Sequence, residues 1–218
     1  MELEYMGAFF DARVDEYEAH MMQYVDGADR YYEVTAQMLP LRPDIKLLDL
    51  GCGTGLELEA IFRRMPQAEV TGIDLSAKML ERLKAKFPDR ALTLRQGSYF
   101  DLPLGEAAFD AVVSVQSLHH FTPERKRGLF ERIRRALRPG GLFVLTDFVA
   151  PNDATEAQCF AEYAALNAQE PGVYHFDTPL TAEHDMALMA QAGLDEPALR
   201  WREKNTVVMT AKRRDEEA

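Results

Sequence analysis

Short apolar runs alternate with segments of helical periodicity between about residue 45 and residue 148. Residues 45–50, IKLLDL, and residues 109–118, FDAVVSVQSL, are nearly continuous apolar runs of a length typical of buried strands. Residues 56–65, LELEAIFRRM, instead repeat apolar positions on one side of a helix. Strands that alternate with helices in this way predict βαβ units, and therefore a parallel sheet that helices cover on both faces.

The C-terminal part of the chain shows a different pattern. A predicted helix at residues 181–193 is followed by two alternating apolar runs that are separated only by REKN. Two strands this close in sequence favour an antiparallel hairpin. The predicted fold class is therefore α/β, with a doubly wound, mostly parallel seven-stranded sheet that ends in an antiparallel C-terminal hairpin. The predicted strands are residues 45–50, 68–75, 91–97, 109–118, 142–148, 197–201 and 206–212.

Two further helices have recognisable boundaries. Ser76 is a plausible N-cap for a helix that runs to about residue 87, and Thr122 precedes a proline in the first position of the next helix. The RPGG of residues 138–141 is expected to end that second helix. Its basic run RIRRALR is interpreted as a solvated face.

Bulk composition narrows the classes of partner. The chain has 218 residues, enough for one domain with a sizeable core, and a formal net charge of −11 that repels phosphate backbones and anionic lipid surfaces. We therefore expect no membrane partner and no direct nucleic-acid binding. The N-terminal segment lacks the pattern of a signal peptide, and no apolar run approaches the ~20 residues that span a membrane.

The two cysteines, Cys52 and Cys159, form no CxxC motif and no Cys/His cluster. Such a sequence has neither a disulfide framework nor the ligand spacing of a zinc site. We therefore expect a reducing, cytoplasmic location and no bound metal. No pattern in the sequence specifies the oligomeric state, and a homodimer stays open.

The stretch LLDLGCGTG, residues 47–55, places three alternating glycines directly after the first predicted strand. Leu56 stands where the dinucleotide fingerprint GxGxxG has its third glycine, and no GK[ST] follows as in a P-loop. By itself the loop is also explained as a strand-to-helix turn. Asp74 narrows the alternatives, because an acid at the end of the second strand accepts hydrogen bonds from ribose hydroxyls in sheets of this type. Its alternative role is a favourable charge at the start of the next helix.

Five motifs in a fixed order give the chain a resemblance to a known family. They are LLDLGCGTG, TGIDLS, QGSYFDLPL, FDAVVSVQSLHHF and ALRPGGLFVL, and together they resemble the class I S-adenosylmethionine-dependent methyltransferases. The resemblance implies a Rossmann-like sheet with S-adenosylmethionine as cofactor and S-adenosylhomocysteine as product. The cofactor-binding residues that it implies are Asp49, Gly51, Cys52, Gly53, Gly55, Asp74, Leu75, Met79, Gly97, Ser98, Tyr99, Val115, Gln116 and Tyr31.

The family's binding mode gives these residues separate roles. The three glycines of the loop would let the backbone lie against the methionine moiety. Asp74 would hold the ribose hydroxyls, with Leu75 and Met79 beside the adenine. Arg30 and Tyr31 are candidates for contact with the cofactor carboxylate.

One position departs from the family pattern. Many relatives carry an aspartate after the third strand's glycine, where it bonds the adenine amino group, but this chain has Ser98 there. The serine hydroxyl or a backbone carbonyl could replace that bond, and Tyr99 could stack on the ring. Asp101 is an alternative partner that lies three residues further on.

The candidate catalytic residues are His119 and His120, which follow the fourth predicted strand in a loop that should face the methyl donor. A histidine there could bind the acceptor or take its proton. The alternative is one packed and one exposed histidine with no chemical role. Asp147, at the end of the fifth predicted strand, is another candidate for the pocket.

The single predicted methyltransferase domain, residues 1–218, has four parts. Residues 1–40 are expected to form a helical lid whose aromatic side chains line the cofactor and acceptor cavity, although Tyr17, Met21 and Tyr24 at helical spacing also suit simple packing. Residues 45–148 are the cofactor-binding core, and residues 181–212 are the final helix and hairpin. Residues 149–180, with Glu170, Tyr174 and His175, are expected to cover the acceptor side.

These observations favour a methyltransferase that transfers a methyl group to a small-molecule acceptor by in-line displacement. FFDARVDEY and WREKNTVVMTAK are similar to the branch that includes carboxy-S-adenosylmethionine synthase, an enzyme of tRNA modification. That enzyme holds an extra carboxylate with a basic residue, whereas the segment PGVYHFDTPLTAEHD offers only His175. A non-catalytic S-adenosylmethionine-binding module is the third alternative. Leu56 and the antiparallel tail count against an NAD-dependent dehydrogenase.

Overall fold

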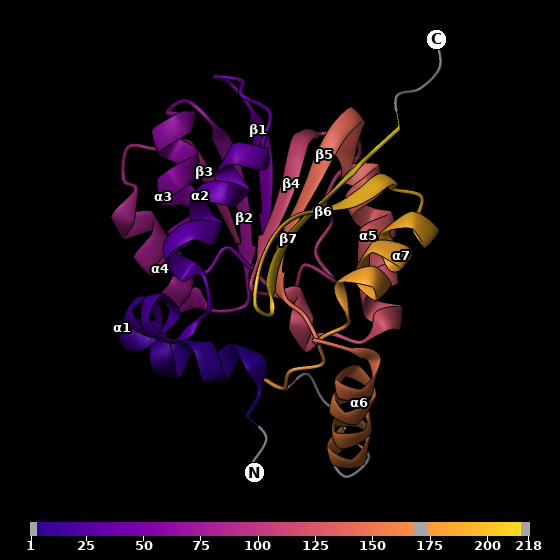
Figure 1. The fold of residues 1–218 in the computed structure, drawn as a ribbon. Coiled ribbons are helices and arrows are strands. Elements are labelled where there is room, and N and C mark those ends of the chain that lie inside the picture. The colour runs from indigo at the N-terminus through magenta and orange to yellow at the C-terminus, as the bar shows by residue number, and fades with distance from the viewer. Residues whose placement is uncertain (1–3, 168–173, 215–218) are drawn as a thin grey trace.

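The computed structural model describes residues 4–167 and 174–214 of the chain. Its strands form one seven-stranded sheet with the order β3-β2-β1-β4-β5-β7-β6 (Figure 1). The strands are β1 (Lys46–Leu50), β2 (Glu69–Asp74), β3 (Leu92–Gln96), β4 (Phe109–Val115), β5 (Leu137–Phe148), β6 (Asp195–Glu203) and β7 (Thr206–Lys212). The helices are α1 (Met6–Tyr24), α2 (Ala28–Met38), α3 (Leu56–Arg64), α4 (Ala77–Lys86), the 3-10 helix η1 (Leu118–His120), α5 (Pro123–Ala136), α6 (Asp153–Asn167) and α7 (Ala182–Gln191).

The pairing of the strands confirms the predicted fold class. Strands β1 to β5 pair in parallel, and β7 runs antiparallel between β5 and β6. Helices α2, α3 and α4 lie on one face of the sheet and α5 and α7 on the other (Figure 1). The chain winds outward from β1 in both directions, and the crevice at such a switch point is where sheets of this type bind their ligands.

Local sequence signals explain most element boundaries. The Ser76 side chain accepts a hydrogen bond from Met79 N at 3.0 Å, as expected of the N-cap of α4. Thr122 is the N-cap residue of α5, and a proline opens that helix. Gly193, with a φ of 81°, follows the end of α7.

β5 and α6 differ most from the predictions, and β4 ends at Val115 rather than at residue 118. β5 begins at Leu137, which pairs with Phe109, and a register shift then precedes the pairing of Ala111 with Leu142. The predicted start at residue 142 is therefore wrong: the RPGG segment ends α5 as expected but forms an irregular part of the strand rather than a loop. Helix α6 was not predicted, because its apolar residues do not gather on one side and it projects away from the sheet (Figure 1).

In the described part of the chain the interior holds two apolar clusters and a buried ion pair between Lys126 and Asp185. In the layer formed by α5 and α7, Lys126 Nζ lies 3.0 Å from Asp185 Oδ1, and both side chains are fully buried. On α5, Arg132 donates hydrogen bonds to three backbone carbonyl oxygens in residues 99–102, one of them Tyr99 O at 2.8 Å. The interpretation of RIRRALR as a solvated face is therefore wrong for Arg132. Its guanidinium supplies hydrogen-bond donors to the backbone carbonyl oxygens of a turn that packs on the helix.

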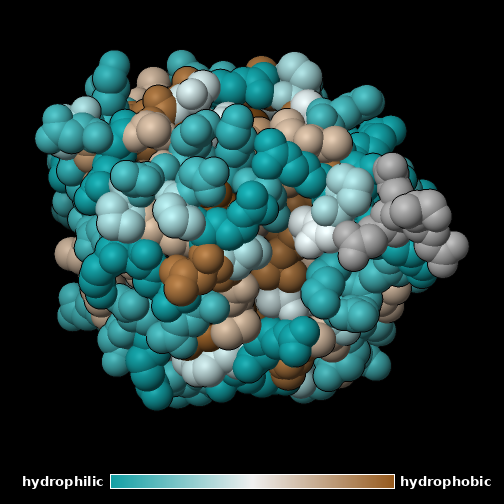
Figure 2. Space-filling view, turned by 90° about the horizontal axis from the view of Figure 1, so that it is seen from above, coloured by the Kyte–Doolittle hydropathy of each residue, from teal (hydrophilic) through white to brown (hydrophobic). Residues whose placement is uncertain are grey.

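Helix α1 lies across the end of the sheet toward which the parallel strands point (Figure 1). Asp11 accepts a hydrogen bond from the Ser76 hydroxyl, and Glu18 pairs with Lys86 of α4 at 2.7 Å. The opposite end of the molecule, seen from above, is covered largely by hydrophilic side chains (Figure 2). Within residues 4–167 and 174–214, each helix is too short or too polar to cross a bilayer.

Candidate active site

The glycine loop between β1 and α3 is built on left-handed backbone. Gly51, Gly53 and Gly55 have φ angles of 78°, 46° and 75°. A β-carbon on Gly51 would lie 2.3 Å from Ser117 Oγ, so the loop and the end of β4 approach too closely for a side chain. A β-carbon on Gly55 would instead meet Leu83 at 3.1 Å, which means that this glycine serves the packing of α4 against the loop.

Asp74 stands beside this loop at the end of β2. Its Oδ2 accepts a hydrogen bond from Gly53 N at 2.9 Å, and its Oδ1 accepts one from Ser76 N at 2.8 Å. Burial raises the pKa of Asp74, while these backbone donors oppose that shift. A carboxylate offers about four lone-pair sites, so both oxygens keep capacity to accept from ribose hydroxyls.

A second pair of acids lies behind the glycine loop. The Asp49 side chain is fully buried, and in the described part of the chain neither of its oxygens accepts a hydrogen bond from a backbone N–H or a basic side chain. Its neighbour is the carboxyl group of Glu57, which is also buried. Burial raises the pKa of Asp49 and raises that of Glu57 to about 7.

Glu57 is a residue that the sequence analysis missed. Acids in the first turn of a helix are common because they favour the helix dipole, so its spacing gave no separate signal. The combination with Asp49 is informative only in three dimensions. Among the described residues neither carboxyl group forms an ion pair with a basic side chain, and two such buried acids suit the ammonium group of a ligand that lies against the loop.

The region expected to hold adenine follows β3. The Tyr99 hydroxyl lies 2.9 Å from Ser117 Oγ, and the ring is buried. Ser98 Oγ accepts a hydrogen bond from Phe100 N at 3.1 Å, and therefore stabilises the turn as well as being available to a ligand. The side chain of Asp101 is exposed.

A small cavity of about 40 Å³ adjoins Asp74. This volume holds only a few water molecules, because three side chains of α1 lie over it. Tyr17 is the nearest of them to the loop, 3.8 Å from the β-carbon position of Gly53. A ribose and an adenine therefore require these side chains to move. The lining residues are Met6, Phe10, Tyr17, Gly51, Asp74, Leu75, Met79, Tyr99, Gln116, Ser117 and His120.

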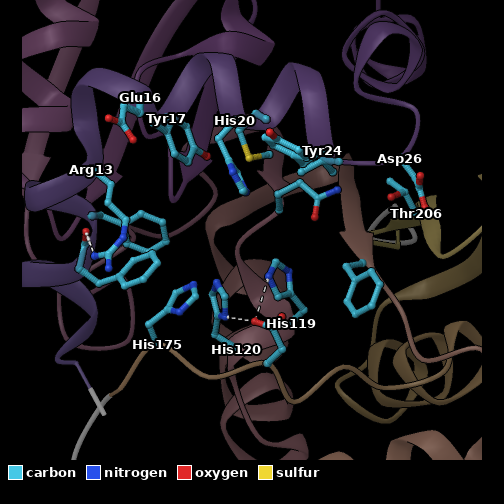
Figure 3. Close-up of a pocket in the computed structure, with 17 residues that line it drawn as sticks. Arg13, Glu16, Tyr17, His20, Tyr24, Asp26, His119, His120, His175 and Thr206 are labelled. Carbon is cyan, nitrogen blue, oxygen red and sulfur yellow. Dashed lines mark hydrogen bonds and ion pairs between the residues drawn. The ribbon is translucent and has the colours of Figure 1, made fainter. Parts of the chain in front are cut away.

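A larger cavity of about 510 Å³ lies between α1, the end of β4 and residues 175–177 (Figure 3). The Phe10, Tyr17, Gln116 and His120 side chains line both cavities, so the two are adjacent. The other lining residues are Phe9, Arg13, Glu16, His20, Met21, Tyr24, Val25, Asp26, His119, Phe148, His175, Asp177 and Thr206.

The structure brings both predicted catalytic histidines to the wall of this larger cavity. His119 Nδ1 lies 2.6 Å from Asp147 Oδ1, and His120 Nδ1 lies 3.0 Å from Asp177 Oδ1. Burial of the His119 ring disfavours its charged form, but the Asp147 carboxylate outweighs burial and raises the pKa of His119. Burial and the neighbouring His119 lower the pKa of His120 to about 4. Neither histidine is exposed, so the alternative of one packed and one exposed ring does not describe the structure.

The segment that precedes α7 completes the wall. His175 stacks on Phe9 of α1, with ring centroids 3.6 Å apart and an interplanar angle of 7°. Tyr174 stacks on Tyr5, and the same two residues form an isolated antiparallel bridge. Glu170, the third residue named for this segment, lies outside the described residues.

Some residues predicted to bind the cofactor lie away from both cavities. Tyr31 is fully buried, with its hydroxyl 3.2 Å from that of Tyr32. It lines neither cavity, but its side chain interacts with Gln116, which lines both. Arg30 is half exposed and forms an ion pair with Glu203. Three others contribute backbone or packing at the same end of the sheet: Cys52, Gly97 and Val115.

Comparisons with known proteins agree with this geometry. Residues 47–141 match a family model described as a methyltransferase domain. A methyltransferase of Synechocystis sp., itself described as uncharacterized, is 36% identical over 129 residues, or 59% of this chain and 59% of the relative. The 27-O-demethylrifamycin SV methyltransferase of Amycolatopsis mediterranei is 37% identical over 129 residues, or 57% of this chain and 46% of the relative. The matches thus span about half of these relatives' length.

Solved structures share the fold. Human N-acetylserotonin methyltransferase in complex with S-adenosylmethionine superposes with a TM-score of 0.68 at 18% identity, covering 94% of this chain and 56% of that protein. A geranyl diphosphate methyltransferase in complex with GPP and sinefungin gives a TM-score of 0.64 at 18% identity, covering 85% of this chain and 77% of that protein. At these identities the likeness shows the fold.

The chain therefore shares the fold of S-adenosylmethionine-dependent methyltransferases, and residues 47–141 resemble a methyltransferase domain. The cofactor that this likeness implies is S-adenosylmethionine. The side chains fit that cofactor. Asp74 keeps acceptor capacity beside the loop, and the unpaired oxygens of Asp49 suit an ammonium group. The closer resemblance to the carboxy-S-adenosylmethionine synthase branch stays a prediction, as do the roles of residues 1–40 as a lid and 149–180 as a cover.

Proposed function

We propose that the protein transfers a methyl group from S-adenosylmethionine to a small-molecule acceptor in the larger cavity. The observation that carries this proposal is the placement of His119, with Asp147 bonded to its Nδ1, on the wall of a cavity that adjoins the small cavity beside Asp74. The names of two similar proteins, a rifamycin methyltransferase and an N-acetylserotonin methyltransferase, refer to small-molecule acceptors and support the same class of acceptor here.

Each group in the site would have a defined task. S-adenosylmethionine supplies, when bound, a methyl group already activated by its sulfonium. Asp74 would hold the ribose and Asp49 the ammonium group, which fixes the position of the methyl carbon. The rings of Phe10 and Tyr17 line the junction of the two cavities, where aromatic faces favour a cation and exclude water.

His119 would remove the proton of the acceptor. Its Nδ1 faces Asp147, which leaves Nε2 as the nitrogen that can accept a proton from the cavity. As the acceptor's lone pair bonds to the methyl carbon, the carbon–sulfur bond breaks, the acceptor's proton passes to Nε2, and S-adenosylhomocysteine is the product. Positioning of the acceptor in line with that bond supplies the larger part of the rate enhancement.

The proposal is tested by incubating the protein with S-adenosylmethionine and pools of small hydroxyl, thiol and amine metabolites. We expect S-adenosylhomocysteine to form together with a methylated product. That product should be ~14 Da heavier than its acceptor, because a methyl group replaces a hydrogen atom. Binding of S-adenosylmethionine without turnover across such pools would favour the non-catalytic alternative. Mass spectrometry of the cofactor that copurifies with the protein separates S-adenosylmethionine from its carboxylated analogue, and recovery of the analogue would favour the synthase.

Asp74→Ala is expected to weaken S-adenosylmethionine binding by more than about tenfold, because the ribose loses a charge-assisted hydrogen-bond acceptor. Isothermal titration calorimetry measures the Kd. The matched control is Glu106→Ala, which removes an exposed acid that lines neither cavity and should leave the Kd unchanged. Equal affinity of wild type and Asp74→Ala would remove Asp74 from the cofactor site.

A further inference from the structure

We propose that His119, His120 and Asp177 form a binding site for a divalent transition-metal ion on the wall of the larger cavity. No pattern in the sequence indicates such a site, since the three residues have no ligand spacing of their own. Only the role of the ion in catalysis rests on the proposed function. The binding of the ion rests on the geometry of the side chains.

The three side chains offer donor atoms at short range. One ligand atom from each residue lies within 4.8 Å of the other two. Asp177 Oδ1 is 3.0 Å from His120 Nδ1 and 3.8 Å from His119 Nε2. Ligands at zinc distances of about 2.0–2.2 Å lie roughly 3–3.5 Å from one another, so small side-chain adjustments suffice to close the site.

The surroundings of His119 are those of a metal ligand. Its Nδ1 is bonded to the fully buried carboxylate of Asp147, and this fixes the ring with Nε2 directed at Asp177. A carboxylate on the far nitrogen of a ligating histidine orients the ring and makes it a better donor. The two histidines come from the loop after β4, Asp147 from the end of β5 and Asp177 from the segment before α7, so the fold itself assembles the cluster.

The site is open on one side. Two imidazole nitrogens and one carboxylate oxygen are three protein ligands, and the adjoining cavity of about 510 Å³ leaves space for a water molecule or an acceptor to complete the coordination. Three protein ligands with an open position are typical of catalytic rather than structural sites. The donor set suits Zn²⁺, Fe²⁺, Co²⁺ and Ni²⁺ better than Mg²⁺ or Ca²⁺.

A bound ion would change which group activates the acceptor. With the ion present, His119 Nε2 is a ligand, and a hydroxyl or thiol of the acceptor that binds the ion loses its proton to water because the ion lowers its pKa. In the metal-free protein His119 itself takes that proton.

Titration of the metal-free full-length protein with Zn²⁺ tests the binding directly, without cofactor or acceptor. We expect one high-affinity ion per chain by isothermal titration calorimetry, and visible d–d absorption from Co²⁺ bound in the same stoichiometry. Asp177→Asn and His120→Ala should each weaken Zn²⁺ binding at least tenfold, and Asp147→Asn by about 10- to 100-fold. The matched control is His20→Ala, because His20 lines the same cavity outside the cluster and should leave the affinity unchanged.

The outcomes separate the inference from the proposed function. Wild-type Zn²⁺ affinity in both Asp177→Asn and His120→Ala, or no stoichiometric binding to the wild type, overturns the metal site. If the wild type transfers methyl groups but binds no Zn²⁺ in the titration, the proposed function stands and the metal site fails. If Zn²⁺ binds as expected but no acceptor is methylated, the proposed function fails and the site stands. Circular dichroism of each variant checks that it is folded.

Discussion

His119→Ala is expected to lower kcat for methyl transfer by about 10²- to 10⁴-fold and to leave the Kd for S-adenosylmethionine unchanged. The histidine touches the larger cavity through Nε2, whereas cofactor binding depends on Asp74 and the glycine loop. Asp147→Asn should lower kcat in the same direction but less, since the ring remains and only its orientation is lost. Turnover and cofactor affinity are measured separately, in chelator-treated protein.

The matched control for this prediction is again His20→Ala, which removes an imidazole from the same cavity but from α1. Its turnover should stay within about twofold of wild type, as expected of a cavity residue without a role in proton transfer. Partial recovery of His119→Ala by added imidazole would support an activating role for the lost ring. Wild-type rates in both His119→Ala and His120→Ala would remove the histidines from the mechanism.

Lys126→Met is expected to lower the free energy of unfolding by about 3–5 kcal/mol, because it leaves Asp185 buried without its partner. Both side chains are fully buried, and the Nζ atom lies within 3.2 Å of both carboxylate oxygens. A loss of this size is a large part of the 5–15 kcal/mol typical of a whole domain. Urea unfolding followed by circular dichroism gives the free energy.

A double variant separates a lost pair from a damaged core. Lys126→Met combined with Asp185→Leu removes both charges, so it should be more stable than either single variant. The control on the surface is Lys204→Met, which breaks the exposed pair with Asp26 and should cost at most about 1 kcal/mol. A double variant no more stable than Lys126→Met would show that packing, not the unpaired charge, determines the loss.

The glycine loop and the place of Asp74 beside it could be predicted because their signals are local in sequence. The first strand, the glycine loop and Asp74 lie within about 30 residues of one another, the length of one βαβ unit. The strand follows from its apolar residues, the loop from its glycines, and Asp74 from its place at the end of a strand. Glu57 was missed because an acid in the first turn of a helix is unremarkable in sequence. Tyr31, although aromatic and one of the residues 1–40 that are expected to form a lid, packs beside Tyr32 rather than in a cavity.

For the side chains around the larger cavity, the sequence patterns are less informative about function. Paired histidines after a strand are compatible with packing, and their neighbours Asp147 and Asp177 are distant in the chain. Lys126 belongs to a strongly basic helix, where a solvated position is the ordinary expectation, yet it is buried against Asp185 of α7. A buried charge depends on a partner from another element, and periodicity within one helix does not encode that partner.

By itself the sequence determined the α/β class, the antiparallel hairpin, the glycine loop and the position of Asp74, because hydrophobic periodicity and turn chemistry act over a few residues. Only the tertiary structure decided that His119, His120 and Asp177 meet at one cavity wall and that Asp147 bonds His119 from behind it. Their convergence depends on the order β1-β4-β5 in the sheet and on the return of the chain before α7. Such long-range packing fixes which side chains share a site, and no local pattern specifies it.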